Sequence, residues 1–273
     1  MYKDYYRLQE EPFSITPDPR YLFLTEQHRD ALNHLLYGIR ERKGFICLTG
    51  EVGSGKTTLC RALLREIGET CHTALVLNPM LSETQLLRSI VEEFGIQTKR
   101  RDRLGYIKLL NEFLLRVNSL GSDAVLIIDE AQVMTVNALE TVRLLSNLET
   151  ETRKLLQIVL VGQPELRTML NNPALRQLTQ RITVRYHLRT MSQEDTAGYL
   201  RHRLKIAGQE DAERTAVRFD YGAVREIYRF SQGTPRLVNA IGDKALLAGY
   251  VRRTNVIDRG VIRLALRDLK EAG

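Results

Sequence analysis

The residues with the clearest chemical potential lie in the segment Phe45 to Leu59, which reads FICLTGEVGSGKTTL. Gly50 and Gly55 have the spacing of a phosphate-binding loop, G-x-x-x-x-G-K-[ST]. Glycines let the main chain curl so tightly that backbone N–H groups can surround a polyanion. An apolar run precedes the loop and a helix-like run follows it, so the first helical N–H groups would point at phosphates. This context favours a triphosphate site over a glycine turn without a ligand.

Two side chains at the end of this loop suit a nucleotide and its metal ion. Lys56 would neutralise charge on the β- and γ-phosphates, and the Thr57 hydroxyl would ligate Mg²⁺. Backbone groups of the loop would supply the remaining phosphate contacts. The sequence therefore predicts an ATP and Mg²⁺ site whose loop residues are Gly50, Glu51, Val52, Gly53, Ser54, Gly55, Lys56, Thr57 and Thr58.

A second chemical element is the acidic pair Asp129 and Glu130, which follows an apolar run 73 residues after Lys56. Asp129 would hold Mg²⁺ through its water shell, and Glu130 would orient and deprotonate an attacking water. Acidic residues are also common where a strand meets a loop. The position of this pair, with one predicted strand between it and the glycine loop, favours a catalytic role over a capping role.

Two amide residues end other predicted strands. Gln163 could reach the γ-phosphate or the water, and we favour that role over an ordinary strand-end amide. Asn78 could restrain Glu130 through a hydrogen bond, and the sequence leaves its assignment to the nucleotide site open.

Two arginines could place a cation at the γ-phosphate, where it would stabilise the charge of the transition state. Arg236 follows Gly-Thr-Pro at a predicted helix start, and we expect it to be a site residue. Arg181 precedes the fifth predicted strand, where Arg176 and Arg185 are competing candidates. Because most arginines are solvated surface residues, the role of Arg181 stays open.

Short apolar runs alternate with amphipathic segments and predict the elements that position these residues. The alternation indicates an α/β fold with a parallel sheet covered by helices on both faces. Right-handed crossovers then place the glycine loop and Asp129 at the same carboxyl edge of the sheet. The predicted strands are 45–48, 73–78, 124–129, 156–162 and 183–188, and the main helices are 25–42, 56–64, 83–94, 103–118 and 136–148.

Beyond Leu188 only helix-like segments remain, at about 192–206, 221–230, 235–250 and 258–269. We therefore predict an α/β nucleotide-binding domain over residues 1–189 and a smaller all-α domain over residues 190–273. Residues 1–25 contain Pro12, Pro17 and Pro19, which forbid a continuous helix. We expect an irregular arm packed on the α/β domain, either against the adenine or simply against the fold.

The composition is that of an ordinary globular protein, with 43% hydrophobic and 27% charged residues in a chain of 273. No run approaches the roughly 18 apolar residues that span a bilayer, and the N-terminus lacks the apolar core of a signal peptide. The three cysteines form neither a zinc pattern nor a disulfide framework. These features predict a cytoplasmic location, and the net charge of +7 permits contact with nucleic acid or an acidic membrane surface without requiring it.

Together these motifs resemble those of AAA+ ATPases. GEVGSGKT is similar to their Walker A motif, VLIIDEA to Walker B, Gln163 to sensor 1 and GTPR to sensor 2. The opening YYRLQEEPFSITPDPRYLFL, with GEVGSGKTTLCR and IDEAQ, resembles the ExeA (general secretion pathway protein A) group. That group includes ATPases of mannose-sensitive haemagglutinin pilus assembly. Transposition ATPases of the TniB and TnsC kind and origin-recognition ATPases are more distant relatives.

The resemblance implies a five-stranded P-loop sheet with a helical lid domain, and ATP hydrolysis in a homo-oligomer with shared active sites. Arg181 stands where the arginine that reaches the neighbouring nucleotide is expected, whereas Gln163 replaces the Asn of many AAA+ proteins. It also implies a role in assembling a type II secretion system or a type IV pilus, in the cytoplasm or at the inner membrane's surface. Longer ExeA proteins continue into a membrane span and a peptidoglycan-binding part, which are not inferred for this chain.

Two other functions remain open at this stage. From Arg201 onwards the chain has 15 Lys and Arg residues against 9 Asp and Glu residues, which suits a DNA-associated ATPase of the transposition or replication kind. A charge run is more often a solvated helix face, so we favour the assembly role. A nucleotide-binding switch with negligible turnover is the third reading.

Overall fold

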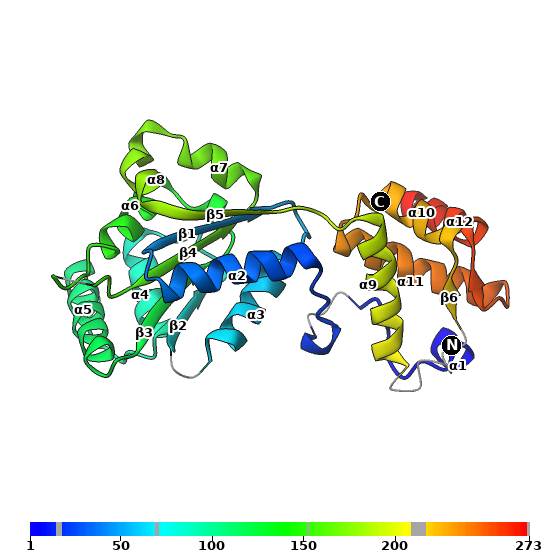
Figure 1. Cartoon of the computed structure of the whole chain (residues 1–273), viewed down its shortest axis with the longest axis horizontal. Coiled ribbons are helices and arrows are strands. Elements are labelled where there is room, and N and C mark those ends of the chain that lie inside the picture. The colour runs from blue at the N-terminus through cyan, green and yellow to red at the C-terminus, as the bar shows by residue number, and fades with distance from the viewer. Residues whose placement is uncertain (15–17, 69–70, 152, 209–216, 272–273) are drawn as a thin grey trace. The chain divides into compact units, whose positions relative to one another are not determined.

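The computed structural model describes residues 1–14, 18–68, 71–151, 153–208 and 217–271. Contacts within the chain divide it into two units (Figure 1). The first, which we call the α/β unit, consists of Glu26–Glu51 and Lys56–Leu188. The second, which we call the helical unit, consists of Met1–Thr25, Val52–Gly55 and Arg189–Gly273.

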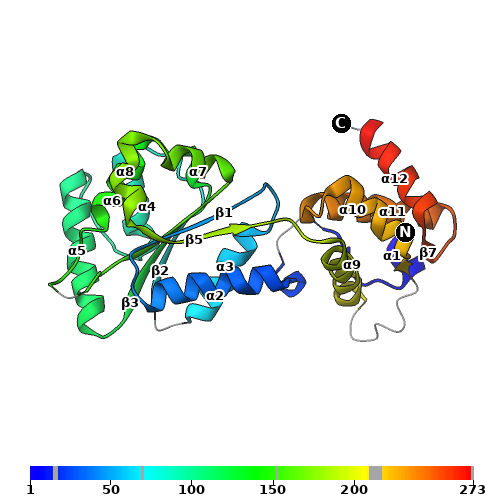
Figure 2. The same cartoon turned by 45° about the horizontal axis from the view of Figure 1, so that its top comes forward.

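Five parallel strands form the centre of the α/β unit, in the order β2-β3-β4-β1-β5. The strands β1, β3 and β4 are buried along almost their whole length because helices cover both faces of the sheet. Figure 2 shows α2 and α3 on one side of the sheet and α7 and α8 on the other. The strands are β1 (Phe45–Gly50), β2 (Cys71–Val76), β3 (Asp123–Ile128), β4 (Gln157–Gly162) and β5 (Ile182–Leu188). This sheet confirms the predicted fold class.

The helices of the α/β unit bury apolar stripes that recur at helical spacing. In α4, for example, Leu86, Leu87, Ile90 and Val91 are all fully buried. Ser82 begins this helix with a capping box, in which its hydroxyl accepts from Gln85 N at 3.4 Å. The helices are α2 (Glu26–Arg40), α3 (Lys56–Ile67), α4 (Glu83–Glu93), α5 (Arg103–Ser119), α6 (Val136–Leu145), α7 (Pro164–Leu170) and α8 (Arg176–Arg181), with short turns η2 (Ala131–Val133) and η3 (Pro173–Leu175).

The helical unit has its own apolar core, which gathers side chains from every one of its long helices. Its helices are α1 (Tyr2–Tyr6), α9 (Gln193–Ala207), α10 (Tyr221–Ser231), α11 (Pro235–Val251) and α12 (Arg259–Glu271), with a short turn η1 (Pro19–Tyr21). At the start of α9, Ser192 Oγ accepts from Asp195 N at 3.0 Å as part of a capping box. Among the described residues, no helix is both long and apolar enough to cross a bilayer.

The expectation of helices alone beyond Leu188 is wrong in one detail. Two short strands, β6 (Arg218–Phe219) and β7 (Val256–Ile257), pair in parallel within the helical unit. A strand of two residues is too short to produce a recognisable alternation in the sequence, so pattern reading could not find it.

The N-terminal arm packs in the helical unit rather than on the α/β domain, which corrects the prediction for residues 1–25. Tyr6 is fully buried, and its hydroxyl donates to Leu246 O at 3.2 Å and to Thr254 O at 3.1 Å. Tyr2 donates to Asp243 Oδ1 at 2.8 Å. The arm also begins with helix α1, where we expected irregular structure. Aromatic residues indicate that a segment is buried but not which core receives it, and Pro17 lies outside the described residues.

Candidate nucleotide site

The glycine loop lies between the end of β1 at Gly50 and the first residue of α3, Lys56. Gly53 has φ 73° and Gly55 has φ 97°, a left-handed conformation that favours glycine. Around these glycines, Ser54 is buried, whereas Glu51, Val52 and Thr58 are exposed. The predicted strand, turn and helix are therefore all present, in the order that a phosphate-binding loop requires.

Lys56 is 95% buried, and its ammonium donates to Gly50 O at 2.8 Å and to Glu51 O at 2.9 Å. Burial lowers the pKa of this ammonium, and the nearby charges of Glu130 and Asp129 oppose that shift. A buried cation that is bonded only to neutral carbonyls lacks a fully compensating anion in direct contact. A polyphosphate supplies such an anion, so the electrostatics of Lys56 fit a nucleotide.

Thr57 and Asp129 meet across 72 residues of sequence, because Thr57 Oγ1 donates to Asp129 Oδ2 at 2.6 Å. Asp129 is only 2% exposed, and its other oxygen accepts from Glu130 N at 2.9 Å. A hydroxyl and a carboxylate are hard oxygen ligands of the kind that Mg²⁺ prefers. Within the described ranges, no group of three or more His, Cys, Asp or Glu residues is arranged to hold a metal ion.

Glu130 is held by two side-chain amides. Its Oε2 accepts from Gln132 Nε2 at 2.5 Å and from Gln163 Nε2 at 3.1 Å. The two amide residues are also joined to each other, since Gln163 N donates to Gln132 Oε1 at 3.0 Å. Glu130 itself has φ 53°, a left-handed conformation that costs energy in a residue with a side chain. Strain of this kind is typical of functional positions that the surrounding structure fixes.

Gly162, the last residue of β4, explains how Gln132 fits into this cluster. A Cβ atom at Gly162 would lie 2.8 Å from Gln132 Oε1 and 2.9 Å from Leu166 Cδ2. The absence of a side chain therefore leaves room for the Gln132 amide. Sequence reasoning included this residue only as part of the string IDEAQ and gave it no role. An amide two positions after the acidic pair was the available signal.

Comparisons with known proteins find similar sequences and structures. A model of the AAA domain matches residues 39–170, which contain both the glycine loop and the acidic pair. General secretion pathway protein A of Aeromonas hydrophila is 45% identical over 266 residues, which is 97% of this chain. The match to the AAA domain covers residues 39–170 of this chain. The chain is also related to general secretion pathway protein A, and it spans 48% of that curated relative's length.

Several solved structures have the same fold. Drosophila ORC bound to DNA superposes with a TM-score of 0.72 at 16% identity, covering 98% of this chain and 66% of that one. The Aeropyrum pernix ORC2 protein gives a TM-score of 0.67 at 17% identity, covering 95% and 71%. The Thermotoga maritima RuvB Holliday junction branch migration motor superposes with a TM-score of 0.54 at 17% identity, covering 90% of this chain and 69% of that one. At these identities the similarity shows the fold alone, and it confirms the P-loop sheet with a helical C-terminal part.

Asn78 does not make the predicted contact in this AAA domain. The strand β2 ends at Val76, so Asn78 lies beyond the strand end, and its Oδ1 accepts from Met80 N at 3.4 Å. No hydrogen bond joins Asn78 to Glu130 in the described part of the chain, where Gln132 and Gln163 hold the carboxylate instead. A phosphate contact by Asn78 stays a prediction.

The two candidate arginines have different surroundings. Arg181 donates from Nη1 to Ser146 Oγ at 2.7 Å and to Asn147 Oδ1 at 2.5 Å, so it joins the end of α8 to the end of α6. Within the helical unit, a Cβ atom on Gly53 would lie 3.1 Å from Arg236 Cβ. That unit therefore places Arg236, at the second position of α11, beside a residue of the glycine loop. The catalytic roles of both arginines stay predictions.

Proposed function

We propose that this chain binds ATP with Mg²⁺ and hydrolyses it. The observation that carries the proposal is the hydrogen bond of 2.6 Å between Thr57 and Asp129, the two residues that we assign to the magnesium ion. Lys56 would bind the β- and γ-phosphates, with the N–H groups of the loop around it. Bound Mg²⁺ would neutralise charge that develops on the phosphate oxygens. Thr57 and Asp129 would hold that ion.

Glu130 is the proposed general base. Its carboxylate would accept a proton from the water whose oxygen bonds to the γ-phosphorus, while the bond from that phosphorus to the leaving ADP oxygen breaks. The Gln132 and Gln163 amides both bond to Oε2, so they fix the direction in which the carboxylate points. The other oxygen, Oε1, accepts no hydrogen bond from the described residues and is the atom that we assign to the water.

Phosphate release and nucleotide binding, measured side by side, test this proposal. We expect Lys56→Ala to abolish ATP binding, because a buried cation that matches the phosphates is lost. Glu130→Gln should bind ATP like the wild type but lose nearly all turnover, since its amide cannot accept the proton. Glu112→Gln, an exposed residue of α5, is the matched control and should keep full activity. Phosphate release that survives in Glu130→Gln would refute the assignment of the base and favour a switch without catalysis.

We further propose that hydrolysis assists assembly of an envelope machine, either a type II secretion system or a type IV pilus. The support is the 45% identity with general secretion pathway protein A. The proposal places the chain in the cytoplasm, where ATP is available, with peripheral attachment to the inner membrane as one option. Isolation of the ATP-locked Glu130→Gln variant from the source cell, followed by identification of co-purified envelope proteins, tests it. Recovery of no envelope component alongside the variant would count against this role.

The proposed active unit is a homo-oligomer in which Arg181 reaches the nucleotide of a neighbouring subunit. The bonds of Arg181 to Ser146 and Asn147 are few enough to be exchanged for a γ-phosphate contact. Mixing Arg181→Ala with Glu130→Gln subunits should restore part of the activity if the site is shared. Absence of rescue at every mixing ratio would exclude the shared site.

A DNA-associated ATPase is the alternative, and the excess of basic residues after Leu188 is the observation that favours it. Fluorescence anisotropy with labelled duplex DNA separates the two. Tight binding that weakens steeply with salt would support the DNA function, because phosphate contacts release counterions. Absence of such binding would leave the assembly function.

A further inference from the structure

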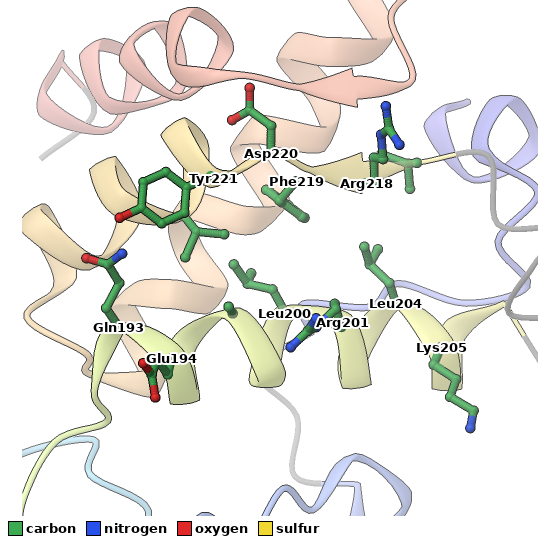
Figure 3. A pocket seen from close by; sticks show the side chains of 13 residues that line it. Gln193, Glu194, Leu200, Arg201, Leu204, Lys205, Arg218, Phe219, Asp220 and Tyr221 are labelled. Atoms are coloured by element: carbon green, nitrogen blue, oxygen red, sulfur yellow. The ribbon is translucent and has the colours of Figure 1, made fainter.

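A groove of about 730 Å³ runs along α9 in the helical unit. One wall is the face of α9 that carries Gln193, Ala197, Leu200 and Leu204, and the other is β6 with the start of α10 (Figure 3). The volume lies in the range of clefts that accept a small ligand or several side chains. Residues 193–205 of α9 would extend about 18 Å at 1.5 Å per residue. The groove therefore follows more than three turns of the helix.

The floor of the groove is apolar. Leu200 and Leu204 point across the gap toward the wall that carries Phe219 (Figure 3). Val217 and Val224 complete the floor from the opposite wall. The leucines and valines of this floor are buried members of the helical unit's own core, so the groove lies directly against that core. A partner that fills the groove must supply apolar side chains.

One end of the groove carries positive charge. Arg201 and Lys205 are exposed on neighbouring turns of α9, and Arg218 is exposed on β6. No described residue forms an ion pair with any of the three. In Figure 3 the charged ends of Lys205 and Arg218 point away from the gap, so their stems contribute to the walls and their cations stay in solvent. Such cations are available to a partner's carboxylates.

We propose that this groove docks an acidic amphipathic helix of a partner protein. A helix laid against α9 would place apolar residues at positions i, i+3, i+4 and i+7 on the floor. Acidic residues beside that stripe would meet Arg201, Lys205 and Arg218. Nucleic acid suits the three cations but not the floor, because phosphates and sugars gain nothing from contact with leucine and valine side chains. This docking site lies within the helical unit and does not rest on ATP hydrolysis.

Designed peptides of about four helical turns test the proposal, with fluorescence anisotropy of each labelled peptide against the full chain. The acidic probe has a leucine stripe at helical spacing with glutamates elsewhere. A basic probe has lysines in place of the glutamates, and a scrambled probe has the acidic composition without the stripe. We expect the acidic probe to bind about tenfold tighter than either of the others, a difference of about 1.4 kcal/mol.

A matched pair of variants locates the binding. Arg201→Glu with Lys205→Glu reverses two charges at spacing i, i+4 beside the groove and should weaken the acidic probe about tenfold. Arg225→Glu with Arg229→Glu makes the same charge change at the same spacing on exposed positions of α10 that do not line the groove, and should leave binding unchanged. Circular dichroism checks that both variants fold. Both should retain the ATP turnover of the wild type.

Several outcomes overturn the proposal. These are no binding of the acidic probe, equal binding of the basic or scrambled probe, or equal loss in both double variants. A further outcome is that no peptide binds, that duplex DNA binds, and that only the double variant Arg201→Glu with Lys205→Glu abolishes the DNA binding. That result would assign the surface to nucleic acid instead. Peptide binding by a chain without ATP turnover would retain the groove and remove the proposed enzymatic function, so the two failures are distinguishable.

Discussion

Gln132→Ala is the substitution that most directly tests the arrangement around Glu130. It removes the amide that donates to Glu130 Oε2 at 2.5 Å and that also accepts from Gln163 N at 3.0 Å. The Gln163 side chain remains on the same carboxylate oxygen at 3.1 Å. Glu130 should therefore keep one of its two amide partners while losing the shorter bond. Gln132 is a positioning residue in this account, because it acts on water only through Glu130.

The size of the effect follows from these contacts. A hydrogen bond to a charged group contributes about 1.5–3 kcal/mol, and the remaining Gln163 bond should retain part of the orientation. We therefore expect turnover to fall about tenfold, equivalent to about 1.4 kcal/mol in the activation barrier. The affinity for ATP should change little, because Lys56 and the glycine loop are untouched. Gln132→Ala with Gln163→Ala should cost more than the sum of the single effects, because each amide retains part of the orientation when the other is removed.

Steady-state turnover together with the dissociation constant of a non-hydrolysed ATP analogue measures both expectations. Gly162→Ala is an independent perturbation of the same amide, since its new Cβ would lie 2.8 Å from Gln132 Oε1. It should lower turnover in the same direction without removing any polar group. Turnover of Gln132→Ala equal to that of the wild type would refute the positioning role. A loss of ATP affinity without a loss of turnover would show that Gln132 acts on binding instead.

Three further predictions concern the helical unit. Arg203→Met should lower the denaturant concentration at the midpoint of unfolding, because the Arg203 guanidinium lies 4.3 Å from the Tyr21 ring centre and donates to Pro12 O and Ser14 O. Arg201→Met, at an exposed position, is the control, and the same midpoint for both variants would refute this prediction. Gly233→Ala should destabilise the protein more strongly than a Gly→Ala change on the surface, because Gly233 has φ 71° and a Cβ atom there would lie 1.9 Å from Met191 O. A thermal unfolding midpoint equal to that of the wild type would refute this prediction. Burial, with the charges of Arg203 and Lys205, lowers the pKa of His202, so the folded state favours the neutral imidazole. The free energy of unfolding should therefore fall as the pH drops through about 6.5. Urea titrations at several pH values should show a weaker pH dependence for His202→Gln, and the same pH dependence as the wild type would refute the prediction.

The parts of the fold that the sequence predicts well are those with strong and repeated patterns. Buried strands such as β3 and β4 are continuous apolar runs, because a parallel sheet hides both of their faces. The capping boxes at Ser82 and Ser192 combine two specific residue types at fixed spacing, which makes such helix starts recognisable in a sequence. The glycine loop and the acidic pair are predictable for the same reason, since their chemistry permits few alternatives at each position.

The parts that the sequence did not predict depend on contacts between distant residues. An aromatic residue such as Tyr6 can be buried in any apolar core, so its residue type does not indicate which core it joins. The structure shows that Tyr6 joins the core of the helical unit. The choice between Asn78 and Gln132 as the partner of Glu130 depends on where β2 ends and on the space left by Gly162. Both amides are chemically suitable, so residue type alone cannot decide which one reaches the carboxylate. Distance decides it, and distance follows from tertiary packing.

The amide pair also bears on why Glu130 has its strained backbone. A residue in the left-handed region costs about 1–3 kcal/mol, so other contacts must hold it there. Gln132 belongs to the η2 turn that directly follows Glu130, whereas Gln163 directly follows strand β4. One carboxylate oxygen is thus bonded to two elements of the α/β unit at once, and a shift of either element would redirect the other oxygen. The orientation of the proposed base therefore depends on how β4 and the η2 turn lie relative to each other. A contact between Gln163 and the γ-phosphate would shift the end of β4 and would thereby change the direction in which the Glu130 carboxylate points.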